Sequence, residues 1–158
     1  MAQTAVALAQ LHALTEELDQ SLAVAWLASG GQQPESRLES RHYLRAWRAV
    51  GRRGERERQV SAVLDIGNEM IHLTRAPGLR LMLKMMRRPA AAAGLASLQR
   101  FLEAGFDTFA ELARGGHARE FLKIVGHRES ELIAMFFDAD ADADACEMAL
   151  KHILGQAP

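Results

Sequence analysis

Apolar residues recur at every third or fourth position through most of this 158-residue chain, and no segment shows the two-residue alternation of a strand. The first segment shows the pattern plainly: the residues that would share one side of its helix are Leu11, Leu14, Leu18, Leu22 and Trp26. Breaks that contain glycine or proline separate the periodic segments. The pattern therefore predicts an all-α fold.

The breaks define the expected helices. The predicted ranges are 2–28, 37–50, 55–74, 79–88, 89–113 and 117–137, with a short last helix over 146–154. A chain of this length, with 49% hydrophobic residues, is expected to bury one core. We expect a single-domain antiparallel bundle of six or seven helices over residues 1–137, followed by an acidic Asp-Ala hinge (138–145) and a short C-terminal helix and tail (146–158).

Charge is segregated along the chain. Residues 1–36 hold four acids and no base, residues 37–102 hold fourteen bases and five acids, and residues 103–158 hold five bases and eleven acids. Within the middle section, residues 71–102 contain no Asp or Glu at all. Such a layout bears on association, because a basic face can meet an acidic partner. The alternative is that the acidic helices pack beside the basic helices and neutralise them.

Two predicted helices carry a basic side. On the helix over 37–50, arginines recur at a spacing that places them on one side of the helix. No Asp or Glu lies four residues after them, so ion pairs within the helix do not neutralise them. The short helix after Pro77 shows the same pattern. The candidate residues for binding an anion or a partner are Arg41, Arg45, Arg48, Arg52, Arg80, Lys84, Arg87 and Arg88. The sequence leaves open whether the two basic sides lie together in space.

Methionines cluster in the same region. Leu79, Met82, Leu83 and Met86 are predicted to face inward from the short helix. Methionine at helical spacing is usually core, and it also suits adaptable binding surfaces. A possible apolar pocket would be lined by Met82, Met86, Phe101 and Phe106, with an arginine at its mouth.

No motif predicts a metal, a cofactor or a catalytic group. Glu69 and His72 have the spacing of carboxylate-bridged di-iron helices, but the chain lacks a second such pair. The aspartates that begin at Asp138 fail as a calcium loop, because alanine occupies both the glycine and the glutamate positions. Lone Cys146 lies among acids, which disfavours its thiolate. We expect no metal and no cofactor and lean towards a non-enzymatic protein, although an active site assembled from distant residues stays open.

The chain shows no targeting segment. Residues 1–18 lack a basic leader and a cleavable apolar core, and no apolar run approaches the roughly 18 residues that cross a bilayer. One cysteine allows no intrachain disulfide and favours a reducing compartment. We therefore expect a soluble cytoplasmic protein.

Several short stretches resemble a known family. They are 14–19 (LTEELD), 50–53 (VGRR), 58–60 (RQV), 88–90 (RPA), 93–95 (AGL), 98–103 (LQRFLE), 105–106 (GF), 121–122 (FL) and 128–129 (RE). Together they resemble an uncharacterised, mostly proteobacterial family whose longer members open with Phe-Phe-Leu-Glu-(Glu/Asp)-Leu-Tyr-Gly. That opening segment is absent here, so the chain is either a shortened relative or starts further upstream. The resemblance, over about residues 5–137, implies an all-helical, cytoplasmic bacterial protein and brings no catalytic residue.

Three hypotheses for the unknown function follow. The first is an interaction module whose basic face contacts an acidic protein or a second copy of the chain. The second is a helical bundle that binds an apolar or amphipathic anion such as a fatty acid. The third, a nucleic-acid binder, is disfavoured by the net charge of −1 and the pI near 6.6.

Overall fold

The computed structural model describes residues 2–29, 36–138, 146 and 148–149, and its regular structure is entirely helical in that part of the chain. The helices are α1 (Ala2–Ala28), α2 (Ser36–Val50), α3 (Arg53–Leu73), α4 (Leu79–Met85), α5 (Arg87–Ala92), α6 (Ala96–Arg114) and α7 (Ala118–Phe137). The predicted all-α fold is confirmed.

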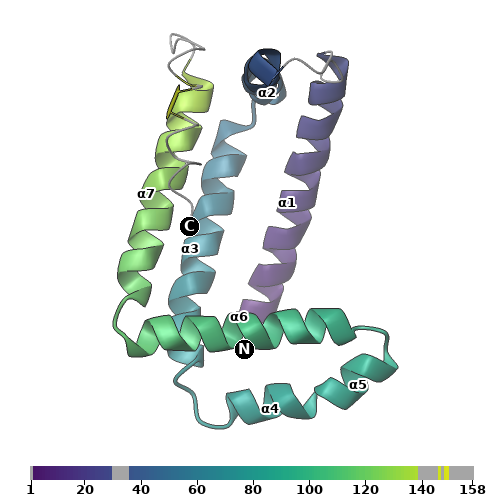
Figure 1. The fold of residues 1–158 in the computed structure, drawn as a ribbon, viewed down its shortest axis with the longest axis vertical. Helices are drawn as coiled ribbons and strands as arrows, with labels where there is room; N and C mark the ends of the chain where they lie inside the picture. Colours follow the sequence, from purple (N-terminus) through teal and green to yellow (C-terminus); the bar gives the residue numbers. More distant parts are fainter. Residues whose placement is uncertain (1, 30–35, 139–145, 147, 150–158) are drawn as a thin grey trace.

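Three long helices form the centre of the molecule. α1, α3 and α7 run along its long axis in alternating directions, and α3 packs against both of the others (Figure 1). α2 crosses one end of this three-helix core, whereas α4, α5 and α6 lie across the other end. The bundle is therefore antiparallel at its centre and closed by crossing helices at both ends.

The helix boundaries depart from the prediction in one place. The segment expected as two helices, over 79–88 and 89–113, forms three, and Pro89 is the third residue of α5 rather than the first. The missing N–H of Pro89 costs nothing there, because the first turn of a helix has no internal partner for it. α5 ends because Gly94 adopts a positive φ of 75°, which brings the Leu95 N–H to 2.7 Å from the Ala90 carbonyl oxygen. The prediction missed this glycine stop.

α3 and α7 approach closely through two glycines. The Leu122 side chain covers Gly67, where an added Cβ would lie 2.4 Å from Leu122 Cδ2. In the opposite direction, Leu64 covers Gly126, where a Cβ would lie 2.9 Å from Leu64 Cδ1. Leu122 belongs to a buried cluster with Ile71, Ala113 and Ala118. The two glycines thus give this helix pair its interlocking contact.

A second cluster joins α2 to α7. Leu44 and Phe136 are buried together with Cys146, and the Trp47 ring lies 5.1 Å from the Phe136 ring between centroids. The guanidinium of Arg56 lies over the Trp47 ring, 4.5 Å from the ring centroid. Arg56 is itself buried. An aromatic and cationic stack therefore connects the end of the core to α2.

The predicted division of the chain is only partly visible. Of the acidic hinge over 138–145, all but Asp138 lies outside the described residues. In the C-terminal segment the structure describes Cys146, Met148 and Ala149, and Cys146 is buried. The separate hinge and tail stay a prediction.

Candidate interaction surface

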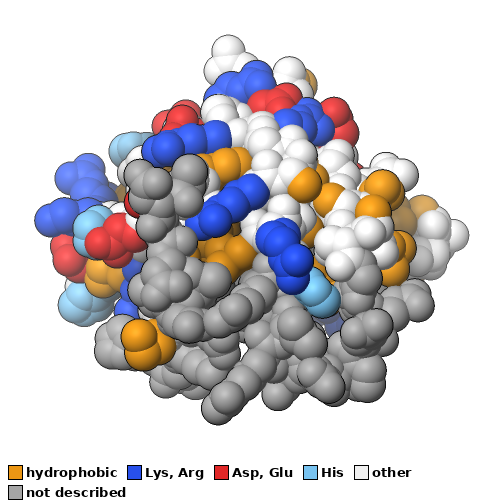
Figure 2. All heavy atoms as spheres, turned by 90° about the horizontal axis from the view of Figure 1, so that it is seen from above, with side chains coloured by type: hydrophobic (Ala, Val, Ile, Leu, Met, Phe, Trp, Pro, Cys, Tyr) orange, Lys and Arg blue, Asp and Glu red, His pale blue; other side chains and the backbone are white. Residues whose placement is uncertain are grey.

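The two basic sides lie at opposite ends of the molecule. α2 crosses one end of the three-helix core and α4 lies across the other (Figure 1). They therefore do not form one continuous basic surface. Seen from the α2 end, Lys and Arg side chains form separate groups with hydrophobic and other side chains between them (Figure 2).

Among the arginines of α2, Arg48 binds the end of another helix. Arg48 donates from Nε to the Phe136 carbonyl oxygen at 3.0 Å and from Nη2 to the Asp138 carbonyl oxygen at 2.6 Å, so it caps the carboxyl end of α7. Arg45 is exposed. The side chain of Arg41 lies outside the described residues.

Arg52, which follows α2, is held by two acids. Its Nη2 lies 2.8 Å from Oε1 of Glu17 on α1 and 2.6 Å from Oε1 of Glu55 on α3. The hydrogen bonds from Arg52 hold the pKa of Glu55 below its ordinary value, and those acids raise the pKa of Arg52. Arg52 also adopts a positive φ of 50°, so the α2–α3 turn places its side chain between the two acids.

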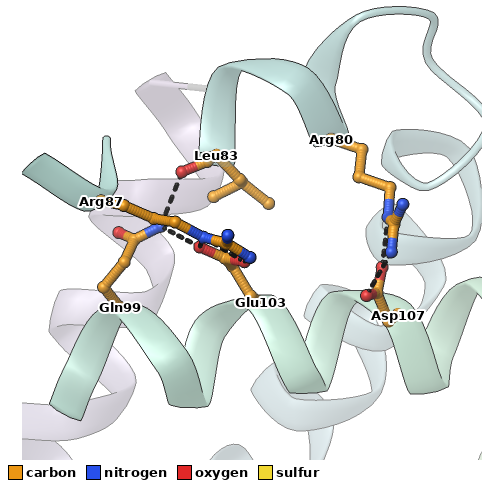
Figure 3. A network of polar contacts seen from close by, with 6 residues as sticks. All are labelled: Arg80, Leu83, Arg87, Gln99, Glu103 and Asp107. Atoms are coloured by element: carbon orange, nitrogen blue, oxygen red, sulfur yellow. Dashed lines mark hydrogen bonds and ion pairs between the residues drawn. The ribbon is translucent and has the colours of Figure 1, made fainter. Parts of the chain in front are cut away.

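The basic side of α4 faces α6. Arg80 binds Asp107 with Nε–Oδ1 and Nη2–Oδ2 distances of 2.6 Å each, and Arg87 binds Glu103 through Nε at 2.8 Å as well as through Nη2 (Figure 3). The buried side chain of Gln99 lies between the helices and donates to the Leu83 carbonyl oxygen at 2.7 Å. These contacts fix α4 and the start of α5 on α6.

The two acids of α6 that bind arginine are held in the charged form. The hydrogen bond from Arg87, with a further one from Gln99, lowers the pKa of Glu103 to about 2. The hydrogen bond from Arg80 lowers the pKa of Asp107. The two ion pairs are therefore intact at neutral pH.

The apolar side of α4 points to solvent as a result. The exposed fractions are 63% for Leu81, 45% for Met82, 68% for Met85 and 48% for Met86. The prediction that Met82 and Met86 face inward is wrong. The physical reason for this difference lies on α6. Glu103 and Asp107 stand one turn apart there, and they select the rotation of α4 that lets Arg80 and Arg87 bind them. Leu79 and Leu83 are half-buried, as predicted.

The predicted apolar pocket is not assembled from its four residues. Phe106 is buried and lines a cavity of about 340 Å³ beside Arg75, Arg80 and Arg114, whereas Met82 and Met86 are half-exposed and do not line it. The side chain of Phe101 lies outside the described residues. This cavity also abuts the carboxyl end of α6, whose Ala110 and Ala113 carbonyl oxygens accept hydrogen bonds from the flanking arginines. The negative end of the helix dipole makes it a poor anion site.

A larger groove separates α1 from α3. Its volume is about 400 Å³, and its lining includes Leu11, Leu14 and Ile66 together with Arg58, Asp65 and Glu69. With two acids to one base, it does not suit an amphipathic anion. His72 is exposed, and the described residues hold no group of three potential metal ligands. None of the helices described combines the length and the apolarity needed to span a membrane.

We define the α4 outer face as Leu81, Met82, Met85 and Met86. Lys84 and Arg88, in the same stretch of chain, are exposed. After the hydrogen bond from Arg80, the charge of Lys84 helps to lower the pKa of Asp107. The sequence predicted the basic side of this helix as the interaction surface and placed its methionines in the core. The acids that could have indicated otherwise are Glu103 and Asp107, which lie one turn apart in the predicted helix over 89–113.

The fold and this surface define a small all-α protein. Its three-helix core carries an arm, formed by α4 and α5, that crosses one end and has an exposed methionine-rich side. Over residues 1–143 the chain matches a family described as a domain of unknown function, DUF8198, and it belongs to that family. The expected membership of an uncharacterised family is confirmed at that level. No curated protein and no solved structure is a significant match to the chain.

Proposed function

We propose that the protein is a non-enzymatic interaction module that binds an acidic, amphipathic protein segment through the α4 outer face. The observation that carries this proposal is the rotation of α4: its bases are used to attach it to α6, and four large apolar side chains are left exposed. A cytoplasmic bacterial setting belongs to the same proposal and fits the lone cysteine.

The apolar character of the surface supports a protein partner. Single exposed apolar residues are ordinary, but a contiguous group on one side of a short helix is typical of an interaction site. Three of the four side chains are methionines, whose flexible thioethers adapt to a partner surface. Leu95, which follows α5, is also 51% exposed. The α4 outer face is thus the densest exposed apolar stretch among the described helices.

The charge around the surface supports an acidic partner. Residues 71–102 contain no acid, and Arg88 is exposed and takes part in no ion pair within the described residues. Lys84 is also exposed, but after the hydrogen bond from Arg80 its charge helps to lower the pKa of Asp107 on α6. The acids that bind Arg80 and Arg87 likewise lie on α6. The hypothesis drawn from sequence therefore changes. Most bases of this region act within the fold, and apolar contacts with Arg88 beside them would meet the partner.

The test is a photo-cross-linking amino acid placed at position 85 in the cells that produce the protein. A control carries the same group at position 130, an exposed serine of α7. We expect one main adduct with an acidic protein from position 85, lost when Met82→Glu is added, and none from position 130. No adduct at position 85, equal adducts at both positions, or an adduct with lipid would contradict the proposal.

A further inference from the structure

We infer that the segment bound by the α4 outer face is α1 of a second copy of this chain; the inference rests on the proposed function and names its partner. α1 carries a second apolar stripe besides the one that packs in the core. We define the α1 outer stripe as Val6, Ala9, Ala13, Val24 and Leu27. Val6, Val24 and Leu27 are 56%, 63% and 57% exposed.

The outer stripe lies opposite the core stripe. At about 100° per residue, its members fall within an arc of roughly 60°, on the far side of the helix from Leu18 and Leu22. The polar Gln20 falls in the same arc, so the stripe has two apolar parts, one towards each end of α1. Leu18 is fully buried, and the inner side of α1 packs against α2 and α3. A helix that is apolar on two sides normally has a partner on each. Within the described residues, the outer side of α1 has none.

The charges favour contact between α1 and α4 over contact between like surfaces. Glu16 borders the outer stripe, Glu17 on its other border binds Arg52, and residues 1–36 contain no base. Two copies joined α4 to α4 would oppose Arg88 to itself, and two copies joined α1 to α1 would oppose Glu16 to itself. The contact of α1 with α4 pairs opposite charges and covers the α4 outer face with one part of the α1 outer stripe.

The dimensions also fit. α1 has 27 residues and is about 40 Å long, which exceeds the length of about 20 Å for α4 and α5 together. α1 runs along the core while α4 lies across its end (Figure 1). One copy can therefore bind through both surfaces at the same time. The contact is heterologous, and it either closes as a reciprocal pair or continues into a longer assembly.

The experiment uses two variants that each remove one surface. Met85→Lys leaves α1 intact, and Val24→Glu leaves α4 intact; both residues are exposed, so circular dichroism should be unchanged. By sedimentation velocity, we expect the unmodified protein to associate, more weakly at high salt, and each variant alone to be monomeric. An equimolar mixture of the two variants should recover association, because it restores one complete α1–α4 contact.

A mixture that stays monomeric although the unmodified protein associates would overturn the inference. Association of either variant alone would also overturn it, since it would indicate contact between like surfaces. Ser130→Lys, on the exposed side of α7, serves as a matched control that should associate normally. A monomeric unmodified protein would also overturn it, and the proposed function would then stand only if position 85 cross-links to a different acidic protein.

Discussion

Arg80 and Asp107 join α4 to α6 through two parallel hydrogen bonds, each 2.6 Å long. Arg87, the first residue of α5, binds Glu103 one turn from Asp107 on α6 (Figure 3). Because Arg80 and Arg87 both face α6, the methionines lie on the opposite side of α4. Ordinary surface ion pairs thus explain why the apolar side of α4 is exposed.

The ion pairs are expected to hold the arm in place. In the double variant Glu103→Gln with Asp107→Asn, α4 should lose its attachment, because neutral amides bind arginine more weakly than carboxylates do. Hydrogen exchange of the α4 amides should become faster while the α3 and α7 amides keep their protection. Glu111→Gln, an exposed acid on the same helix, is the control. Unchanged α4 exchange in the double variant would show that the ion pairs do not position the arm.

Acid should release the arm before the core unfolds. The pKa of Glu103 is lowered from 4.5 to about 2, so its stabilising effect is fully present above pH 4.5 and is lost as the pH falls towards 2. NMR spectra recorded over this range should show changes in α4 and α5 first. Glu103→Gln should remove most of this pH dependence. The same acid-induced change in Glu103→Gln as in the unmodified protein would contradict the assignment.

The α3–α7 contact should tolerate no side chain at Gly67. Gly67→Val would overlap Leu122, a buried residue, and should lower the free energy of unfolding by about 1–3 kcal/mol. Gly105 is the matched control, because it is an exposed helical glycine with nothing within 4 Å of an added Cβ. Gly105→Ala should raise the free energy of unfolding by about 0.5–1 kcal/mol. Urea denaturation measures both, and a stabilised Gly67→Val would refute the packing described.

The buried arginine of α3 should matter through its shape as well as its charge. Arg56 lies over the Trp47 ring and binds Asp19 at 3.3 Å. Arg56→Ala should cost about 1–3 kcal/mol and change the tryptophan fluorescence. Arg56→Lys should recover only part of this loss, because an ammonium cannot lie flat on the indole. Full recovery by lysine would mean that charge alone is needed.

The sequence predicted the helices well because their apolar spacing and glycine or proline breaks act locally. The extent of α1 agrees with its predicted range, and α2, α3 and α7 differ by two residues or fewer at each end.

The orientation of α4 could not be predicted from its own residues. An amphipathic helix normally buries its apolar side, and Met82 and Met86 were placed inward by that rule. The rule fails here because α4 is short and its neighbour offers two carboxylates instead of an apolar groove. That information lies in Glu103 and Asp107, which are distant in the chain from the bases they bind.

The rate of methionine oxidation tests the exposed apolar face most directly. In dilute protein treated with hydrogen peroxide, peptide mass spectrometry should show Met82, Met85 and Met86 oxidising rapidly, because all three are about half-exposed or more. Met70 and Met135, which are half-buried, should oxidise more slowly. If Met82 and Met85 oxidise no faster than Met135, α4 turns its apolar side inward and the account of this surface is wrong.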